Sequence, residues 1–458
     1  MRIKAKEYFL WGLLALVSFC VTSCKNDDGV EEGIPFDPGK PVVISSFVPE
    51  EGGWGSRLLL YGDNFGDDPA KVKVIIGGKE AKVISVTSQN LYCFVPRGAD
   101  AGDIEVSILN EKGEELAYGG IEKKFVYKKK YLASTLVGEM YENNTKYDII
   151  DGPWGNCGGL EKMEWLVFDP NNKDRLYVCG GAKTHRVVDF AEKTLSSMKF
   201  TGEAAGECNI LSFTNDGQLI VVRNIAQDNK NGIFFYSPES NFQTLVKALP
   251  ARGCRAAIPH PINGEIYTSR YDKGWIGRYD PVSGNYKMDE IQMPYASMDL
   301  YIAIHPKGHY MYIMVRNKFV IYRADYDFGM KTFTTPYLVC GKYQEKGFTD
   351  GVGGNARLNE PQQGCFVRNK EYEGQKDEYD FYFTDKQNHC IRTLTPTGRV
   401  KIYAGRPNGN GSNGFNDGDL RKEARFNYPA GIVWDEKREC LLVGDSDNHR
   451  IRKIAMEE

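Results

Sequence analysis

Apolar and polar residues alternate with a period of two from residue 41 to residue 128. The alternation comes in short runs that Gly, Pro and Asp interrupt, among them VVISSFVP, RLLLYGDNFG, KVKVIIGG and DIEVSIL. A period of two turns every second side chain of a strand to the same face, so that one face is apolar and the other polar. The pattern predicts a small antiparallel β-sandwich over residues 41–128.

Recurrence of whole segments replaces simple alternation from residue 129 to residue 458. The segment Ala356–Pro361 (ARLNEP) aligns with Ala424–Pro429 (ARFNYP), and FYFTDKQNHCIRTL aligns with LLVGDSDNHRIRKI. Weaker units, each a strand, an Asp or Asn turn and a second strand, cover 164–189, 208–235, 255–280 and 300–322. A repeated sheet buries both faces only by stacking on its neighbours, so these six units predict a six-bladed β-propeller.

The segment Tyr131–Gly138 (YLASTLVG) has the pattern of the strand that closes a repeat, as in Val400–Gly405 (VKIYAG). We expect it to complete the last blade, because pairing the first strand of the ring with the last ones removes free sheet edges. The charged segment Lys370–Glu378 then reads as a surface insertion.

Two family resemblances follow from these motifs. Tyr61–Gly66 (YGDNFG), Gly77–Gly78 and Val95–Gly98 (VPRG) resemble, in this order, the IPT/TIG family of immunoglobulin-like domains. That resemblance implies a spacer or an interaction module. The order of a lead ending in ArF-x-x-P, a strand, and D-x-x-N-H-x-I-R resembles the NHL repeat. The expected fold class is all-β, an IPT/TIG sandwich over 41–128 followed by a six-bladed NHL-type propeller over 129–458.

The N-terminal segment is expected to direct export. Basic residues precede an apolar stretch from Phe9 to Val21, which is the plan of a signal peptide over residues 1–23. The ending Val21-Thr22-Ser23-Cys24 resembles a bacterial lipoprotein box, which implies acylation of Cys24. Residues 24–40 form an acidic, Gly/Pro-rich tether that resembles the surface-export signal of Bacteroidetes lipoproteins. The expected location is the outer membrane, on the cell exterior, with the lipid anchor as the membrane contact.

Composition narrows the class of partner. The net charge of −3 without a basic cluster argues against a nucleic-acid partner. Nine cysteines follow Cys24 at irregular spacing with no CxxC pair, so metal-ligand spacing is absent and no cofactor is predicted. One or two disulfides remain open, since the pairing is not readable from the sequence.

No catalytic motif occurs, and no catalytic residue is assigned. Histidines recur at equivalent positions of the repeats, which favours a structural role in the turns over a unique site. The repeated turns comprise Asp385, Asn388 and His389, with Asp445, Asn448 and His449. His260 and His305 likewise occupy a turn position that Asp fills elsewhere; the alternative is a divalent metal held by these two in the central channel.

Propellers bind ligands where the loops of successive blades meet at one rim, so aromatic and charged residues of those loops are the candidates. The predicted ligand-binding residues are Trp154, Trp165, Arg255, Arg270, Tyr271, Trp275, Tyr295, Asp299 and Tyr301. The overall plan resembles accessory surface proteins of Bacteroidetes glycan-uptake systems, which implies that the rim binds a carbohydrate, either a polysaccharide or a host glycan. Two alternatives stay open, a lyase or hydrolase with a channel metal and a scaffold that contacts an outer-membrane transporter.

Overall fold

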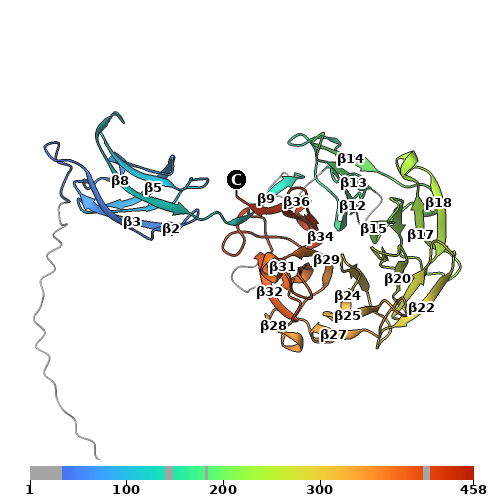
Figure 1. Cartoon of the computed structure of the whole chain (residues 1–458). Coiled ribbons are helices and arrows are strands. Elements are labelled where there is room, and N and C mark those ends of the chain that lie inside the picture. The colour runs from blue at the N-terminus through green and yellow to red at the C-terminus, as the bar shows by residue number, and fades with distance from the viewer. Residues whose placement is uncertain (1–32, 140–147, 181–183, 406–412, 458) are drawn as a thin grey trace, which may run out of the picture. The chain divides into compact units, whose positions relative to one another are not determined.

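The computed structural model describes residues 33–139, 148–180, 184–405 and 413–457. Cys24, the signal segment and the first part of the tether lie outside these residues. The chain divides into two compact units that meet between Lys128 and Lys129 (Figure 1). None of the described residues forms a helix long and apolar enough to cross a membrane. The short 3-10 turns are η1 (Pro69–Lys71), η2 (Gly202–Ala204), η3 (Pro238–Ser240), η4 (Arg316–Lys318), η5 (Gly353–Asn355), η6 (Lys370–Tyr372), η7 (Lys386–Asn388) and η8 (Ser446–Asn448).

The first unit is the β-sandwich that the alternation predicts. Its strands neighbour one another in the order β1-β3-β6-β5-β4-β7-β8-β2. Phe65 is fully buried in the core between the strands, as expected from its place in the YGDNFG turn, together with Leu60 and Phe125. The strands are β1 (Val43–Val48), β2 (Glu51–Gly52), β3 (Arg57–Asp63), β4 (Val72–Ile76), β5 (Lys79–Val86), β6 (Asn90–Phe94), β7 (Gly102–Leu109) and β8 (Glu115–Tyr127).

The second unit is a six-bladed propeller, with its six sheets arranged around a common centre (Figure 1). Blade 1 contains β11 (Met163–Phe168), β12 (Arg175–Gly180), β13 (His185–Asp189), β14 (Thr194–Met198) and the short β10 (Gly152–Pro153). Blade 2 contains β15 (Ile210–Phe213), β16 (Leu219–Val222), β17 (Asn231–Tyr236) and β18 (Leu245–Pro250). Blade 3 contains β19 (Ala257–Pro259), β20 (Ile266–Arg270), β21 (Trp275–Tyr279) and β22 (Tyr286–Gln292).

The remaining blades have the same plan, in which the innermost strand precedes the second and third strands along the chain. Blade 4 contains β23 (Leu300–Ile304), β24 (Tyr310–Val315), β25 (Val320–Asp327), β27 (Tyr337–Gly341) and β26 (Thr332–Phe333). Blade 5 contains β29 (Pro361–Arg368), β30 (Tyr379–Asp385), β31 (Cys390–Leu394), β32 (Arg399–Gly405) and β28 (Gly351–Val352). Blade 6 contains β34 (Pro429–Asp435), β35 (Cys440–Asp445), β36 (Arg450–Met456) and β33 (Gly418–Asp419), and takes its outer strand from elsewhere.

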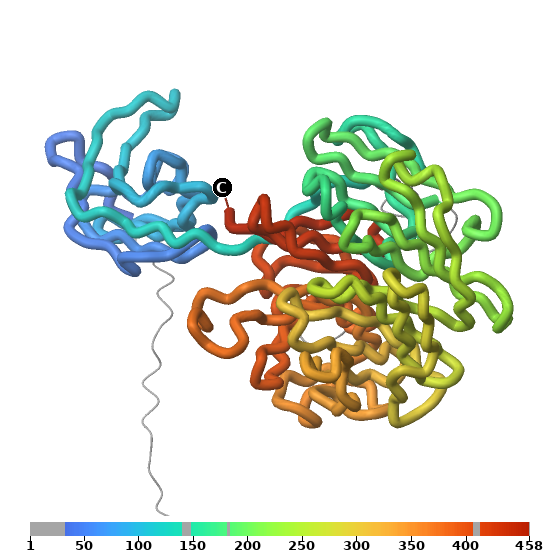
Figure 2. The backbone as a smooth tube through the Cα atoms, turned by 45° about the vertical axis from the view of Figure 1, so that its right-hand side comes forward, coloured from blue at the N-terminus to red at the C-terminus, as the bar shows by residue number. Residues whose placement is uncertain are grey.

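That outer strand is β9 (Tyr131–Val137), the first strand of the unit. It pairs antiparallel with β36, with Tyr131 opposite Met456 and Val137 opposite Ile451. Figure 2 traces the start of the propeller alongside its red C-terminal strand. The expectation that this segment closes the ring is therefore confirmed, and the predicted propeller fold is confirmed with it.

Strands in the middle of the blades are apolar on both sides. All four residues of β16 and all six residues of β24 are buried. Both faces of such a strand are covered, because each blade lies between two others, and a doubly covered strand reads as a continuous apolar run. The weaker repeat units of the sequence are therefore strands without apolar–polar alternation, because neighbouring blades cover both of their faces.

The repeated Asp-Asn-His turns lie where the second strand of blades 5 and 6 ends. The Asp385 carboxylate, which is fully buried, accepts hydrogen bonds from Asn388 Nδ2 at 2.8 Å and from Arg392 at 3.0 Å. Asp445 accepts the equivalent bonds from Asn448 and Arg452, both at 2.8 Å. Burial raises the pKa of Asp445 to about 6, an effect that the Arg452 guanidinium opposes. The carboxylates thus tie the turns of their own blades.

The two histidines of these turns bridge to the next blade. His389 Nδ1 accepts a hydrogen bond from the backbone N–H of Tyr428 in blade 6, at 3.1 Å. His449 Nδ1 lies 2.6 Å from the carbonyl oxygen of Leu160, which precedes blade 1. Both histidines have the left-handed backbone conformation, with φ of 54° and 53°. The turns therefore connect one blade with its neighbour.

Candidate functional site

The propeller has two faces, which we name by the inner strands. On the start face the inner strands begin; on the turn face they turn into the second strands. Neighbouring turns contact each other on the turn face: Asn215 of blade 2 donates to the carbonyl oxygen of His260 of blade 3 at 3.1 Å, and Lys437 of blade 6 contacts Asp174 of blade 1 at 2.7 Å. Each face is a candidate binding surface, and the two differ in chemistry.

Charged side chains of blades 3 and 4 meet a polar side chain of blade 2 on the start face. Asp299 accepts hydrogen bonds from Arg255 at 2.9 Å and from Arg316 at 3.0 Å. Arg255 also donates to the Asn209 side chain at 3.0 Å. The exposed fractions are 10% for Asp299, 19% for Arg255 and 22% for Arg316. The carboxylate is therefore already shared between two guanidinium groups.

A second charged group joins blades 1 and 5 on the same face. Glu164 accepts hydrogen bonds from Lys386 at 3.0 Å and from Gln362 at 2.6 Å. Burial acts to raise the pKa of Glu164, but the nearby Lys386 ammonium and the Gln362 bond outweigh it, and the pKa is lowered overall. The carboxylate is thus ionised and held by donors of this chain.

Trp165 and Tyr301, which were predicted to bind ligand, are packed against each other instead. Their rings stack with centroids 5.9 Å apart and planes 19° apart. Only 4% of Trp165 and 3% of Tyr301 is exposed. The two inner strands that carry them, β11 and β23, belong to blades 1 and 4, so the stack connects two blades that are not neighbours along the chain. The side chains of these two inner-strand residues thus fill the centre of the ring.

The other predicted residues of blades 3 and 4 also lie on the start face and are mostly engaged. Arg270 binds Asp272 at 2.9 Å and lies over the Trp275 ring at 5.4 Å. Tyr271 has the Arg255 guanidinium at 5.9 Å from its ring centre. Tyr295 is 51% exposed and stacks on Tyr343 at 4.3 Å. The structure thus brings together eight of the nine predicted ligand residues: Trp165, Arg255, Arg270, Tyr271, Trp275, Tyr295, Asp299 and Tyr301.

Trp154 lies apart from this group, beside β14 of blade 1. Its ring meets Phe190 edge-on at 5.4 Å, and its indole N–H donates to the carbonyl oxygen of Thr194 at 3.2 Å. Both the ring and the N–H are therefore used within blade 1.

Gln363 of β29 closes the space between the inner strands of blades 1, 5 and 6. Its amide oxygen accepts from the backbone N–H of Leu166 at 2.9 Å and of Ile432 at 3.0 Å, and its amide NH₂ donates to the carbonyl oxygen of Leu166 at 2.7 Å. Only 4% of the residue is exposed. One side chain thus satisfies backbone groups of two other blades.

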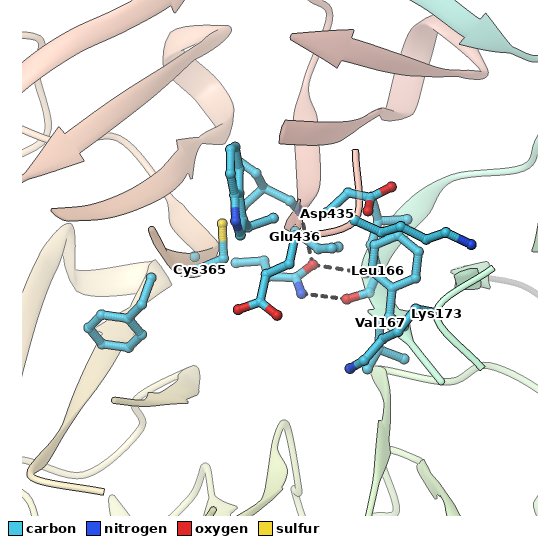
Figure 3. A pocket seen from close by; sticks show the side chains of 14 residues that line it. Leu166, Val167, Lys173, Cys365, Asp435 and Glu436 are labelled. Carbon is cyan, nitrogen blue, oxygen red and sulfur yellow. Dashed lines mark hydrogen bonds between the residues drawn. The ribbon is translucent and has the colours of Figure 1, made fainter. Parts of the chain in front are cut away.

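Below Gln363, toward the turn face, two cavities adjoin. The first, of about 580 Å³, is lined by Leu166, Val167, Phe168, Lys173, Gln363, Gly364, Cys365, Phe366, Ile432, Val433, Trp434, Asp435, Glu436 and Lys437 (Figure 3). The second, of about 560 Å³, is lined by Tyr131, Val367, Arg368, Asn369, Lys370, Tyr382, Tyr403, Trp434, Glu436, Glu439, Leu441 and Ile454. Because both contain Trp434 and Glu436, we treat them as one site, the Trp434 groove.

Trp434 differs from the other tryptophans of the propeller in its contacts. Within the described part of the chain, its indole N–H makes no hydrogen bond and its ring makes no contact with another aromatic ring or a cation. The residue is partly exposed and packs on the core of blades 5 and 6. The sequence did not single it out, because Trp434 follows an apolar run (GIV) and reads as an ordinary strand residue. Its role depends on the gap between blades 5 and 6, which one sequence does not show.

The two histidines considered as metal ligands serve their own turns. His260 Nδ1 accepts from the backbone N–H of Ile262 at 3.3 Å, and His305 Nδ1 accepts from that of Lys307 at 3.1 Å. The second ring nitrogen of His260 contacts the carbonyl oxygen of Gly308, and that of His305 contacts Asp377 at 3.5 Å. Burial lowers the pKa of His260. The two rings thus make separate contacts within the protein.

Comparisons with known proteins agree with the two-unit architecture. The IPT/TIG domain family matches residues 41–124. NHL repeat-containing protein 2 of Bos taurus is 32% identical over 112 residues, and its human counterpart is 31% identical over 114. Each match covers 24% of this chain and 14% of the relative, so the chain spans only a small part of those proteins.

Solved structures from Bacteroides match over almost the whole chain. An auxiliary nutrient binding protein from Bacteroides thetaiotaomicron is 46% identical, with 93% of this chain and 100% of that chain covered and a TM-score of 0.88. An auxiliary nutrient binding protein from Bacteroides ovatus is 42% identical with the same coverage and a TM-score of 0.73. A third protein, from Bacteroides thetaiotaomicron, carries the provisional name of a phosphatase; it is 37% identical, with 94% and 100% covered and a TM-score of 0.79.

Proposed function

Because the chain belongs to the same family as the auxiliary nutrient binding proteins of Bacteroides thetaiotaomicron and Bacteroides ovatus, we propose that it is a nutrient-binding protein whose ligand is a carbohydrate. The N-terminal segment supports a surface location, with Cys24 as the lipidated residue and residues 24–40 as the tether. In this proposal the protein binds its ligand beside a glycan-uptake transporter of the outer membrane and does not change the ligand chemically.

The observation that carries the proposal is the Trp434 groove. Sugar rings have an apolar C–H surface and a rim of hydroxyl groups, so a site for them needs an accessible aromatic ring bordered by polar groups. The unengaged Trp434 indole supplies the ring, with Tyr382 and Tyr403 beside it in the second cavity. Glu436 and Glu439 supply exposed carboxylates as hydrogen-bonding partners for hydroxyl groups.

The start face is the weaker surface for the same ligand. Its carboxylates and cations are paired with one another, so a ligand there would have to replace bonds that the protein already makes. In the Trp434 groove a ligand displaces water alone from the indole ring. Because the Tyr295–Tyr343 stack is exposed, the start face serves as the comparison surface in the experiment.

The test is affinity electrophoresis of the soluble chain, beginning after Cys24, in native gels that contain plant or host polysaccharides. We expect at least one polysaccharide to retard the wild type and Trp434→Ala to migrate as in a gel without polysaccharide. Trp275→Ala, a partly exposed tryptophan on the start face, is the matched control and should be retarded like the wild type. Circular dichroism and thermal melting establish that both variants are folded.

Several outcomes would contradict the proposal. If Trp434→Ala is retarded like the wild type while Trp275→Ala is not, the ligand binds at the start face. If no polysaccharide retards the wild type, the ligand is not one of these carbohydrates. Release of reducing sugar from the polysaccharide, or of phosphate from a phosphate ester, would show that the protein is an enzyme.

A further inference from the structure

Two cysteines and a histidine meet in the interior between blades 1 and 2. Cys179 lies near the end of β12, His185 is the first residue of β13, and Cys208 lies just before β15. Among the described residues, one donor atom of each lies within 4.8 Å of the others. The exposed fractions are 0% for Cys179, 1% for His185 and 4% for Cys208. Residues from two blades thus place two sulfur atoms and a ring nitrogen around one buried point.

The hydrogen bonds of this cluster leave its sulfur and nitrogen atoms without strong partners. Cys208 Sγ donates to the carbonyl oxygen of Ile210 at 2.9 Å, and Cys179 Sγ donates to that of Cys208 at 3.4 Å; thiols are weak donors. His185 Nδ1 is buried and has no hydrogen-bond partner in the described part of the chain. A buried polar atom without a partner is rare in native proteins and calls for a specific cause.

We propose that Cys179, His185 and Cys208 bind a divalent thiophilic metal ion of the Zn²⁺ class. Thiolate sulfur and imidazole nitrogen are the ligands that Zn²⁺ prefers, at about 2.3 Å and 2.0 Å. Tetrahedral coordination at these lengths separates two sulfur ligands by about 3.8 Å, so small side-chain rotations from the present arrangement bring the three donor atoms to ligand distance and leave the fourth position to a solvent oxygen. Two thiolates and a neutral imidazole around Zn²⁺ form a site without net charge, which avoids the cost of burying an ion.

This role is independent of ligand binding at the Trp434 groove. The metal connects β12 and β13 of blade 1 to the segment that begins blade 2, and it does so in the part of the ring that lacks Asp-Asn-His turns. Metal bound to the folded chain alone stabilises that chain by mass action. The expected function of the site is therefore to fasten blades 1 and 2.

Cys254 offers a matched control inside the same repeat pattern. It precedes the inner strand of blade 3 as Cys208 precedes that of blade 2, and its Sγ donates to the carbonyl oxygen of Ala256 at 3.1 Å, two residues on, as Cys208 does. Cys254 is also fully buried, but no metal-binding group of the described residues includes it. Substitution of Cys254 thus removes an equivalent thiol without touching the cluster.

The experiment is a titration of the reduced soluble chain with Co²⁺, followed by displacement with Zn²⁺, both without oxygen. We expect one equivalent of Co²⁺ to give a thiolate-to-metal charge-transfer band, which Zn²⁺ abolishes. Cys179→Ser and Cys208→Ser should bind Co²⁺ at least tenfold more weakly, whereas Cys254→Ser should match the wild type. Zn²⁺ should raise the Tm of the wild type and of Cys254→Ser, and of neither cluster variant.

Two results would overturn the proposal. One is a wild-type titration without the charge-transfer band, or with a band that Cys179→Ser and Cys208→Ser retain. The other is recovery of a peptide that links Cys179 to Cys208 from protein purified without reductant, because a disulfide would consume both sulfur ligands. If a serine variant fails to fold, the linked-peptide measurement and the wild-type titration still decide.

Discussion

The two faces of the propeller are built from similar residues and use them differently. On the start face, Asp299 and Glu164 each hold two donors of the same chain. On the turn face, the Trp434 ring has no aromatic or cationic partner among the described residues, and it borders two adjoining cavities. Whether a side chain is available to a ligand thus depends on the contacts that it already makes within the fold. The residue type alone does not show these contacts.

The largest expected effect is a loss of folding stability caused by a substitution on the start face. Asp299→Ala leaves Arg255 and Arg316 without their shared carboxylate, so we expect unfolding to become easier by about 3 kcal/mol, measured by urea denaturation. Carbohydrate retardation should be unchanged. Asp228→Ala is the control: Asp228 pairs with Arg270 but is 59% exposed, and its loss should cost less than about 1 kcal/mol. A stable Asp299→Ala protein that no longer binds carbohydrate would reverse the assignment of the two faces.

Gln363 lies between the start face and the Trp434 groove. Its substitution should have the second-largest effect on the stability of the propeller. Gln363→Ala leaves backbone groups of Leu166 and Ile432 unpaired in the interior, at an expected cost of about 2 kcal/mol. Gln363→Glu retains both acceptor bonds but turns an oxygen of a buried carboxylate toward the Leu166 carbonyl oxygen, so it should also unfold more easily than the wild type at pH 7. Equal stability of all three proteins in urea would show that the bridge contributes nothing.

A pH-dependent effect is expected at Glu164. Its pKa is lowered in the folded chain from the ordinary value of 4.5, so its pairing stabilises the fold above pH 4.5 and is lost as the pH falls through the folded pKa. Glu164→Gln should therefore unfold more easily than the wild type by about 1 kcal/mol at pH 7, and the gap should be smaller at pH 3. An equal gap at both pH values would assign the effect to packing.

The smallest expected effect sharpens the view of the turn face. Trp434→Phe keeps an aromatic ring but presents a smaller surface, so affinity should fall about threefold, or about 0.6 kcal/mol. The urea midpoint should stay at the wild-type value. Trp275→Phe on the start face should leave affinity unchanged, and a loss there comparable to that of Trp434→Phe would remove the distinction between the faces.

Much of the fold could be predicted from local patterns. Alternation over 41–128 and the repeated D-x-x-N-H-x-I-R motif indicate strands and blades directly, since both reflect short-range geometry. The closing role of Tyr131–Gly138 was predicted too, because its pattern matches the closing strands Pro336–Gly341 and Val400–Gly405 of two repeats.

The site was harder to predict, because it depends on contacts between blades. Trp165 and Tyr301 look like any exposed loop aromatic, and only the ring geometry brings them face to face. The sequence also indicated no metal-ligand spacing, yet the fold brings Cys179 and Cys208, 29 residues apart, into one cluster. A ligand set shared between two blades has no fixed spacing along the chain.

The pairing of β9 with β36 has a consequence for how the protein is made. Ser134 and Lys453, which face each other in this pair, are 319 residues apart. Joining the ends of so long a loop costs about 5 kcal/mol of chain entropy. The growing polypeptide therefore leaves the ribosome with its first propeller strand unmatched until the final one is synthesised. The ring therefore cannot close on a partly synthesised chain.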